Sequence, residues 1–309
     1  MDKMLHLSSS PHIHSGRSTA RIMLDVLIAL LPATVAGAII FGIRSLLIVS
    51  VCVSSCVLFE YLFNLVTKKA QTIGDLSAVV TGLLLALNLP ANIPLWQCGI
   101  GCAFAIILVK CLFGGIGNNL VNPAMTARIF MTVSFSSMAI PAMPTIVDAV
   151  SSATPLVEIS KNESPKLLDL FLGTTGGAIG ETCALALLLG LVYLLVRRVI
   201  TWHIPVSFIG TVFIFSFFME GFDPMKALAL IMSGGLFIGA IFMATDYVTS
   251  PSTWGGKLIF GLGAGLITVL IRYFGTYSEG VSFAILFMNI LTPYIDKLTA
   301  RRIFGGAKV

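Results

Sequence analysis

Long, continuously apolar runs are the feature that most limits what this chain can fold into. Hydrophobic residues make up 57% of the sequence and charged residues 11%, whereas soluble domains carry about 25% charged residues. Several runs reach the roughly 20 residues that an α-helix needs to cross a bilayer. The runs are apolar throughout rather than alternating, which argues against a transmembrane β-barrel. The sequence therefore predicts an all-α polytopic membrane protein.

We expect about ten transmembrane helices, separated by glycine, proline and charged residues. The expected segments are 22–42, 45–66, 76–90, 95–113, a fifth that ends near 138, 177–196, 203–219, 225–248, 257–274 and 281–298. The glycine-rich stretch 114–123 interrupts the pattern between the fourth and fifth segments. Such breaks at membrane depth usually line a cavity that the protein encloses.

A weak internal repeat relates the two halves of the chain. A shift of 161 residues places Pro90 on Pro251 and Gly114 on Gly275. With five segments in each half the two repeats would be inverted, an arrangement that builds a site near the middle of the bilayer. The chain then divides into a cytoplasmic N-terminal segment 1–21, a first five-helix half 22–138, an extracytoplasmic loop 139–175, a second five-helix half 176–298 and a cytoplasmic tail 299–309.

The basic residues lie between the apolar runs, where they act as determinants of topology. The net charge of +5 is therefore no sign of nucleic-acid binding. When both termini are placed in the cytoplasm, the cytoplasmic side receives Lys68, Lys69, Lys110, Arg197, Arg198, Lys257 and Arg301. The opposite loops carry mainly Glu220, Asp223 and Glu279. This orientation puts the loop 139–175 outside the membrane.

The sequence shows no motif for hydrolysis and no pattern of metal ligands. None of the six cysteines forms a CxxC pair. Two pairs, Cys52 with Cys56 and Cys98 with Cys102, have the four-residue spacing that places both members on one helix face. Small buried side chains explain this spacing better than ligation of a cluster. We expect neither a metal site nor a catalytic side chain.

Four aspartates at or near the ends of the apolar segments are candidates for an ion path. They are Asp25, Asp75, Asp246 and Asp296. Ionisable groups inside a membrane are costly, and they often mark function. Hydrogen bonding at helix ends is the more ordinary interpretation of each. Asp75 and Asp246 are the stronger candidates because each adjoins the third segment of its half, and a path for Na⁺ or H⁺ needs oxygen ligands at such depths.

Asn119 and Asn122 lie three residues apart beside the glycines of the broken segment. In a helical turn this spacing puts both side chains on one face. An amide offers a donor and an acceptor, which suits a ring with both, such as the isoalloxazine of a flavin. Capping of the broken helix by asparagine explains the pair equally well.

The stretch 148–154 is short, polar and part of the only long loop. Ser151, Ser152 and Ala153 are small enough to let a bulky group approach the Thr154 hydroxyl. We interpret Thr154 as an attachment point for a cofactor that bears a phosphate. Taken alone, the stretch is also compatible with an ordinary polar loop, because a pattern of seven residues often arises by chance.

Several stretches together resemble one family over nearly the whole chain. They are 10–14, 23–32, 114–124, 243–246 and 279–289. The family contains the RnfD subunits of Rnf electron-transport complexes and the NqrB subunits of the sodium-pumping NADH:quinone reductase, and the short N-terminal region is closer to the Rnf type. The resemblance implies ten helices in two inverted halves, similar to the architecture of urea transporters.

The resemblance also implies flavin cofactors. In the family, the threonine that ends an Asp-x-x-Ser-Gly-Ala-Thr pattern carries FMN through a phosphoester bond that a separate flavin transferase makes. That threonine corresponds to Thr154, with Asp148 and Ser151 in register and Ser152 in place of the usual glycine. A second, non-covalent flavin, riboflavin or FMN, is associated with Asn119 and Asn122. Thr154 would thus be an acceptor and not a catalyst.

The expected function is that of an electron-carrying subunit in a multi-subunit, ion-translocating oxidoreductase of a prokaryotic inner membrane. Electrons would pass between ferredoxin and NAD through partner subunits and these flavins, coupled to transport of Na⁺ or H⁺. No nucleotide-binding pattern is present for NAD. The alternative is a stand-alone channel or secondary transporter of urea-transporter-like architecture, which would leave the loop around Thr154 without a role.

Overall fold

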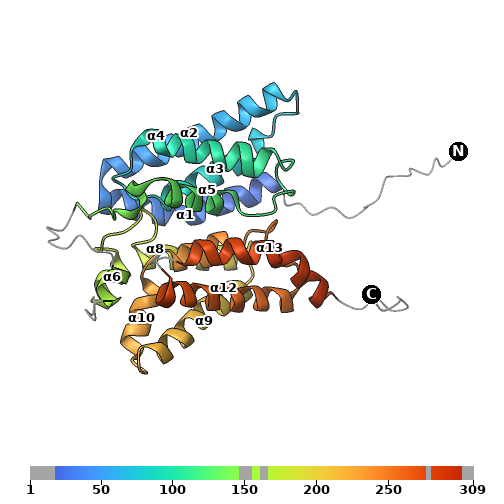
Figure 1. Ribbon diagram of the computed structural model, residues 1–309. Helices are drawn as coiled ribbons and strands as arrows, with labels where there is room; N and C mark the ends of the chain where they lie inside the picture. The colour runs from blue at the N-terminus through green and yellow to red at the C-terminus, as the bar shows by residue number, and fades with distance from the viewer. Residues whose placement is uncertain (1–17, 146–154, 161–165, 276–279, 301–309) are drawn as a thin grey trace, which may run out of the picture.

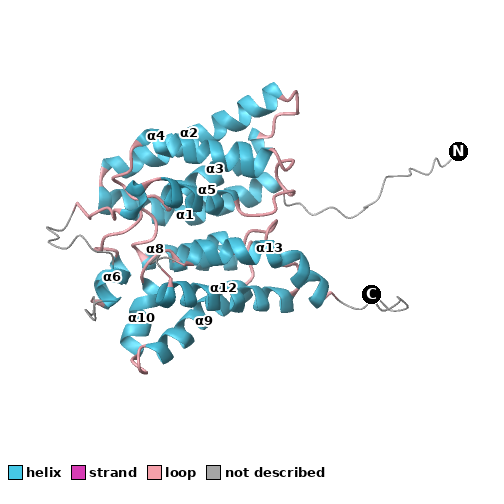
Figure 2. Ribbon diagram, in the orientation of Figure 1, coloured by secondary structure: helices cyan, strands magenta, loops and turns pink. Residues whose placement is uncertain are grey.

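The computed structural model describes residues 18–145, 155–160, 166–275 and 280–300. Within these ranges the chain is helical and has no β-strand, only two isolated bridges that join Pro90 to Ala178 and Ala142 to Gly177. Figure 1 shows two groups of helices side by side, and Figure 2 shows the loops that connect them. The predicted all-α class is confirmed.

The first half forms the upper group in Figure 1. Its longest helices are α1 (Thr19–Phe41) and α2 (Ile43–Val66). The 3₁₀ turn η1 (Ile73–Asp75) leads into a short helix α3 (Ser77–Leu87). Helix α4 (Leu95–Ala103) continues directly into a π-helical segment η2 (Phe104–Cys111), and α5 (Pro123–Ser134) and the turn η3 (Ser136–Ala139) follow.

The second half repeats this order of elements. Two short helices, α6 (Pro155–Ser160) and α7 (Leu167–Leu172), connect the halves. Helices α8 (Ala184–Val196) and α9 (His203–Met219) come next. The third position holds α10 (Pro224–Met232), α11 (Leu236–Ile238) and a π-helical segment η4 (Gly239–Met243). Helices α12 (Trp254–Phe274) and α13 (Val281–Thr299) complete the bundle.

Corresponding helices of the two halves meet at the interface between them. Helix α1 packs against α8, and α5 packs against α13. Gly190 of α8 allows close approach, because a Cβ there would lie 2.5 Å from the Ala29 backbone oxygen of α1. The halves therefore share one core, while the inverted relation between them and the five-part division of the chain stay predictions.

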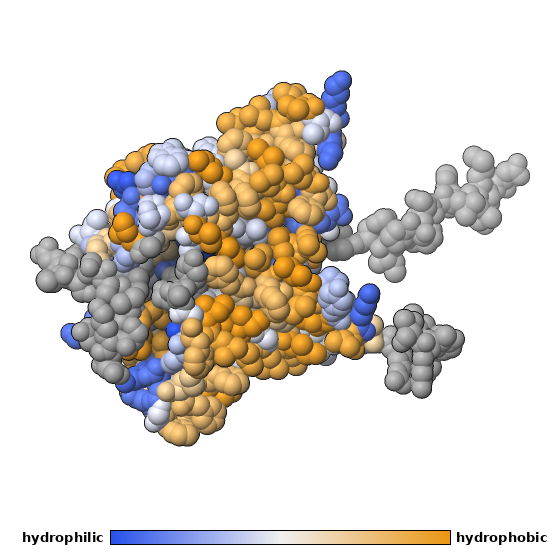
Figure 3. Space-filling view, viewed as in Figure 1, coloured by the Kyte–Doolittle hydropathy of each residue, from blue (hydrophilic) through white to orange (hydrophobic). Residues whose placement is uncertain are grey.

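The outer surface is apolar, as a lipid-facing surface must be. Large hydrophobic side chains such as Leu31, Leu62 and Val206 are 54%, 42% and 57% exposed. Figure 3 shows hydrophobic residues across the side of both halves and hydrophilic residues gathered toward the two ends. Four helices, α1, α2, α12 and α13, are long and apolar enough to cross a membrane. The chain is thus a multi-pass membrane protein.

Other expected segments differ from the structure in length or in shape. Helices α3 and α5 have 11 and 12 residues, and the expected segment 225–248 breaks between α10 and α11 with a bend of 65°. The expected segment 177–196 starts too early, because helix α8 begins at Ala184. Before it, the backbone N–H groups of Ile179 and Gly180 donate to the carbonyls of Leu89 and Leu87. The count of ten membrane-spanning helices stays a prediction.

The bundle has two distinct ends. Helix α1 begins and α13 ends at the same end, whereas α6 lies at the opposite end (Figure 1). Contacts agree with this, since Arg197 after α8 reaches Asp25 near the start of α1. At the other end, Thr145 donates from its backbone to the Ile40 carbonyl near the end of α1. We call the first the terminal end.

Candidate functional site

A cavity lies between the two halves at the terminal end, with an empty volume of about 800 Å³. Helices α1, α3, α5 and α8 line it together with the π-helical segments η2 and η4. Its lining is mainly apolar, and the side chains that carry polar or charged groups are Ser77, Thr81, Lys110, Asn119, Asn122, Thr245, Asp246 and Tyr247. An apolar cavity with a few convergent polar groups is the usual form of a small-molecule site.

The two asparagines singled out from the sequence both line this cavity. Asn122 caps helix α5, since its Oδ1 accepts from the Met125 backbone N–H at 3.2 Å. Its Nδ2 donates to the Met243 carbonyl at 3.4 Å and so ties the first half to η4. Pro123 follows at the first position of the helix, where its missing N–H costs nothing. The capping interpretation is therefore confirmed for Asn122.

Asn119 is different, because part of its amide is unsatisfied. The residue is 9% exposed, and its Oδ1 has no hydrogen-bond partner among the described residues. A buried polar atom without a partner is costly, and each such atom calls for an explanation, such as a ligand or water. Asn119 thus offers the cavity an acceptor that a bound molecule with an N–H group would satisfy.

Asp246 lines the cavity from the second half. It follows η4, and its carboxylate accepts from the Val248 backbone N–H and the Thr249 hydroxyl, each at 3.4 Å. Asp246 therefore caps the turn after η4 and at the same time contributes one negative charge to the cavity wall.

Asp75 lies beside the cavity rather than in its lining. Its Oδ1 accepts from the Ser77 backbone N–H at 2.8 Å and from the Ser77 hydroxyl at 2.5 Å. This is the helix-end role that the sequence suggested as the ordinary interpretation, here at the start of α3. Ser77, which lines the cavity, connects the two.

Asp25 and Asp296 lie outside the cavity lining. Asp25 accepts from the Tyr193 hydroxyl at 3.0 Å and forms an ion pair with Arg197. Asp296 accepts from the backbone N–H and the hydroxyl of Ser252 at 3.0 and 3.1 Å. Both join neighbouring segments at the terminal end, so the structure brings all four aspartates to one end but only Asp246 into the cavity.

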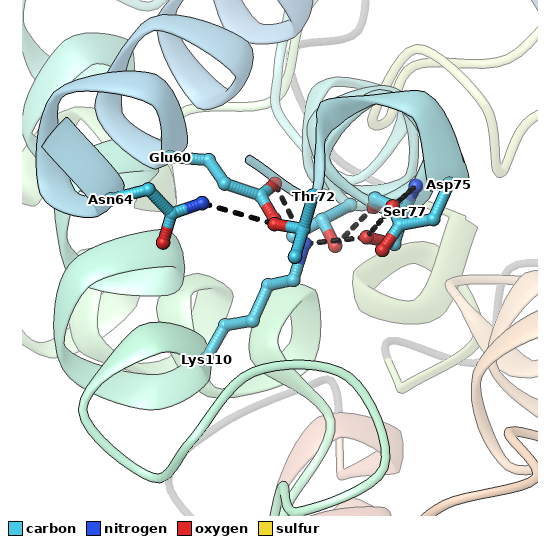
Figure 4. A network of polar contacts seen from close by, with 7 residues as sticks. Glu60, Asn64, Thr72, Asp75, Ser77 and Lys110 are labelled. Carbon is cyan, nitrogen blue, oxygen red and sulfur yellow. Dashed lines mark hydrogen bonds and ion pairs between the residues drawn. The ribbon is translucent and has the colours of Figure 1, made fainter. Parts of the chain in front are cut away.

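A buried ion pair adjoins the cavity, and the sequence analysis missed it. The Lys110 Nζ donates to Glu60 Oε2 at 2.8 Å and to Ser77 Oγ at 2.5 Å (Figure 4). Lys110 and Glu60 are each 2% exposed. The interpretation of Lys110 as a loop charge that sets topology is wrong, because it lies within η2 and in the protein interior. Glu60 inside the apolar segment 45–66 was the available signal, since charges there are costly.

The polar contacts continue from this pair to the surface. Glu60 Oε1 accepts from the Thr72 hydroxyl at 2.6 Å, and the Asn64 Nδ2 donates to the same hydroxyl at 3.1 Å. Thr72 is exposed and belongs to the turn before α3. Figure 4 shows these side chains converging from α2, η2 and the turn around Asp75. A continuous polar route therefore joins the terminal end to the cavity wall.

A second buried ion pair lies one helical turn deeper. Arg128 donates to Asn88 Oδ1 at 2.6 Å and to Glu181 Oε2 at 3.3 Å. Asn88 and Arg128 follow the cavity residues Leu84 and Ala124 by four positions, which puts each on the same helix face. The Glu181 Oε1 accepts from the Ala178 backbone N–H at 3.0 Å. The pair joins the first half to the segment that precedes α8.

The break between α10 and α11 is supported by arginine side chains. Arg272 of α12 donates to the carbonyls of Leu230 and Ser233, at 2.7 and 3.1 Å, and so satisfies the end of α10. A Cβ at Gly235 would lie 2.8 Å from Arg128 Nη1. The glycine is therefore required for the close approach of the broken helix to the deeper ion pair.

The cysteine pairs lie in a packed helix interface. Cys52, Cys56, Cys98 and Cys102 are all fully buried. Helix α2 packs against α4, and the Cys102 thiol donates to the Cys52 carbonyl at 3.5 Å. Their role as small buried side chains agrees with the prediction.

The predicted attachment site is not part of this geometry. Asp148, Ser151 and Thr154 lie outside the described residues. The next residue, Pro155, begins helix α6, which lies at the end opposite the terminal end (Figure 1).

An all-helical chain with an apolar exterior and a cavity between its two halves is a polytopic membrane protein with an internal small-molecule site. The chain belongs to the NQR2, RnfD, RnfE family, whose match covers residues 6–305. The predicted family is therefore confirmed.

The chain is similar to curated relatives over its full length, each of them the D-type subunit of its complex. It is 46% identical to that of the Na⁺-translocating ferredoxin:NAD⁺ oxidoreductase complex of Acetobacterium woodii, with 99% of this chain and 96% of the relative covered. It is 42% identical to that of the proton-translocating ferredoxin:NAD⁺ oxidoreductase complex of Clostridium ljungdahlii, with 97% and 96% covered. The relative from the ion-translocating oxidoreductase complex of Escherichia coli (strain K12) is 35% identical, with 99% of each chain covered.

Proposed function

We propose that this chain is the flavin-carrying membrane subunit of an ion-translocating ferredoxin:NAD⁺ oxidoreductase complex in a prokaryotic inner membrane. Electrons pass through a covalent FMN on Thr154 and a second, non-covalent flavin, riboflavin or FMN, in the cavity. Full-length similarity to subunits of ferredoxin:NAD⁺ oxidoreductase complexes supports the proposal. The reactions of ferredoxin and NAD⁺ belong to the partner subunits.

The observation that carries the proposal is the fit between the cavity and a flavin ring. The cavity offers about 800 Å³ with a mainly apolar lining, which suits a flat aromatic ring. Asn119 Oδ1 provides an unsatisfied acceptor, and the isoalloxazine has a ring N–H to donate. Lys110 and Asp246 add one charge of each sign. A bound flavin supplies the electron-transfer chemistry, and the protein supplies binding, orientation and electrostatics.

The cavity assignment is tested by counting flavins. Acid extraction of the purified complex should release one flavin fewer per complex when Asn119 is replaced in Asn119→Leu. The matched control is Asn92→Leu, because Asn92 is exposed and does not line the cavity. Equal flavin content in the Asn119→Leu and wild-type complexes would remove the flavin from this cavity.

The covalent FMN on Thr154 has support from the fold at one point. Helix α6 starts at the next residue and lies at the end opposite the cavity, so flavins at the two sites would serve opposite ends of the bundle. A flavin transferase would make the phosphoester bond. Thr154→Ala should abolish the flavin fluorescence of the denatured chain in a gel, and Thr174→Ala should retain it. Fluorescence that survives in Thr154→Ala would exclude this anchor.

The terminal end provides groups for ion entry. Asp25, Asp75, Asp246 and Asp296 lie there, and Asp75 contacts the cavity wall through Ser77. The names of the relatives assign Na⁺ to one complex and protons to another, so the proposal covers either ion. Asp75→Asn should lower electron-driven ion transport by the complex in liposomes at matched protein content. Unchanged transport would remove Asp75 from the path.

A stand-alone channel or secondary transporter is the competing function, and the broken helix pair α10 and α11 favours it. Such a protein would transport its solute in liposomes without an electron donor. Ion flux through the complex that depends on reduced ferredoxin would support the electron-transport function, whereas flux through the isolated chain without a donor would support the competing one.

A further inference from the structure

The charges on the cavity wall are few and unevenly placed. Among the described residues that line the cavity, Lys110 is the one basic side chain and Asp246 the one acidic side chain. They come from different halves, Lys110 from η2 and Asp246 from the turn after η4. A ring bound between them has a positive charge on the side of the first half.

Lys110 reaches the cavity wall through an uncommon backbone. Residues Phe104–Cys111 are π-helical, and Lys110 lies in the last turn of this segment. A π-helical turn inside an α-helix is rare and is frequent at functional sites. Its wider turn alters the direction of the side chains that follow it, and here the Lys110 side chain points inward to Glu60 and Ser77 (Figure 4).

The ion pair is asymmetric with respect to the cavity. Lys110 belongs to the cavity lining, whereas Glu60 lies behind it and is absent from the lining. Glu60 is held in place by Thr72, whose hydroxyl donates to its Oε1 at 2.6 Å. The carboxylate therefore partly offsets the lysine charge that a molecule in the cavity experiences, at a greater distance than the lysine itself.

We propose that Lys110 sets the reduction potential of the flavin in the cavity and that Glu60 moderates this effect as a positioning residue. The inference rests on the proposed function. Adding an electron to the ring adds negative charge next to the Lys110 ammonium. In a buried site that contact is weakly screened. The ammonium thus stabilises the reduced ring more than the oxidised ring, which raises the potential, and charge near the ring is a recognised means of tuning a flavin.

The geometry requires opposite effects from the two partners. Glu60→Gln leaves Lys110 in the cavity wall with less compensation and should raise the potential. Glu60→Gln with Lys110→Met removes both charges together and should lower the potential, because the lysine is the nearer of the two. Lys110→Arg keeps the positive charge and should leave the potential close to that of the wild type.

The test is a redox titration of the purified complex, followed by the visible absorbance of its flavins. The double variant should shift one flavin couple, the one that Asn119→Leu removes, to lower potential by at least tenfold in the reduction equilibrium, or ~30 mV for two electrons. Glu60→Gln should shift the same couple upward. The control is Glu220→Gln with Lys226→Met, another glutamate–lysine pair that lies outside the cavity lining.

The outcomes separate this inference from the proposed function. If the wild-type complex has a flavin that Asn119→Leu removes, but Glu60→Gln and the double variant leave its potential unchanged, Lys110 and Glu60 are only a structural pair and the inference is wrong. If Asn119→Leu removes no flavin, the proposed cavity site fails and the inference fails with it. If the double variant does not retain the flavin, the direction of the Glu60→Gln shift decides, with no shift or a downward shift contradicting the inference.

Discussion

The two buried ion pairs differ in what surrounds them. Lys110 and Glu60 border the cavity and connect through Thr72 to the surface. Arg128 and Glu181 lie deeper, between α5 and the segment before α8, where Gly235 leaves no space beside the guanidinium. Both pairs are nearly inaccessible to solvent, so burial alone does not distinguish them. Access to a cavity does, and it makes the first pair responsive to a ligand and the second a fixed connection.

The largest stability effect is expected at the deeper pair. Arg128→Met leaves the Glu181 carboxylate without the guanidinium in a packed interior, and breaking a buried pair in this way costs about 3–5 kcal/mol. Thermal unfolding of the purified protein in detergent, followed by circular dichroism, measures the loss. A loss no larger than that of Glu60→Gln would show that the deeper pair is not the fixed connection we describe.

Close packing around Arg128 gives the next prediction. In Gly235→Ala the added Cβ would lie 2.8 Å from Arg128 Nη1 and 3.2 Å from Glu181 Oε2. Overpacking of this kind typically costs about 1–3 kcal/mol. Gly210→Ala is the control, because a Cβ there meets nothing within 4 Å and alanine favours a helix by about 0.5–1 kcal/mol. Equal stability of the two variants would contradict the packing.

Glu60→Gln should destabilise less than Arg128→Met. Lys110 keeps its hydrogen bond to Ser77 and lies beside a cavity that can admit water. We expect a loss near the lower end of the roughly 1–3 kcal/mol that a buried group costs when it loses a partner. The same unfolding measurement compares the two variants directly, and a loss equal to that of Arg128→Met would mean that the cavity gives Lys110 no relief.

The smallest effect is expected where an ion pair reaches solvent. The Arg197 side chain is 50% exposed, and Asp25 keeps the Tyr193 hydroxyl as a donor when Arg197 is removed. Arg197→Met should therefore change the stability by no more than about 1 kcal/mol, measured at low and high salt. A larger loss would show that exposure does not rank these pairs.

Long apolar helices were predictable because their signal is local. The expected segments 22–42, 203–219 and 281–298 agree with α1, α9 and α13 to within a few residues at each end. The Asn119 and Asn122 pair was also found from spacing and neighbouring glycines, and both residues line the cavity. Composition and periodicity carry such information within a window of about 20 residues.

Features that depend on contacts between distant segments were not predictable. Residues 177–183 read as the start of a helix because they are mainly small or apolar, but they pair with the end of α3 instead. Lys110 resembles a loop charge in the sequence, and its partner Glu60 is 50 residues away. Only the packing of α2 against η2 shows that the two charges meet.

The most direct test of a flavin-carrying subunit is mass spectrometry of the peptide that contains Thr154, taken from the assembled complex. We predict that this peptide carries the additional mass of FMN joined by a phosphoester, and that Thr154→Ala loses it while the complex still assembles. An unmodified Thr154 peptide from a complex that is active in electron transfer would contradict the account.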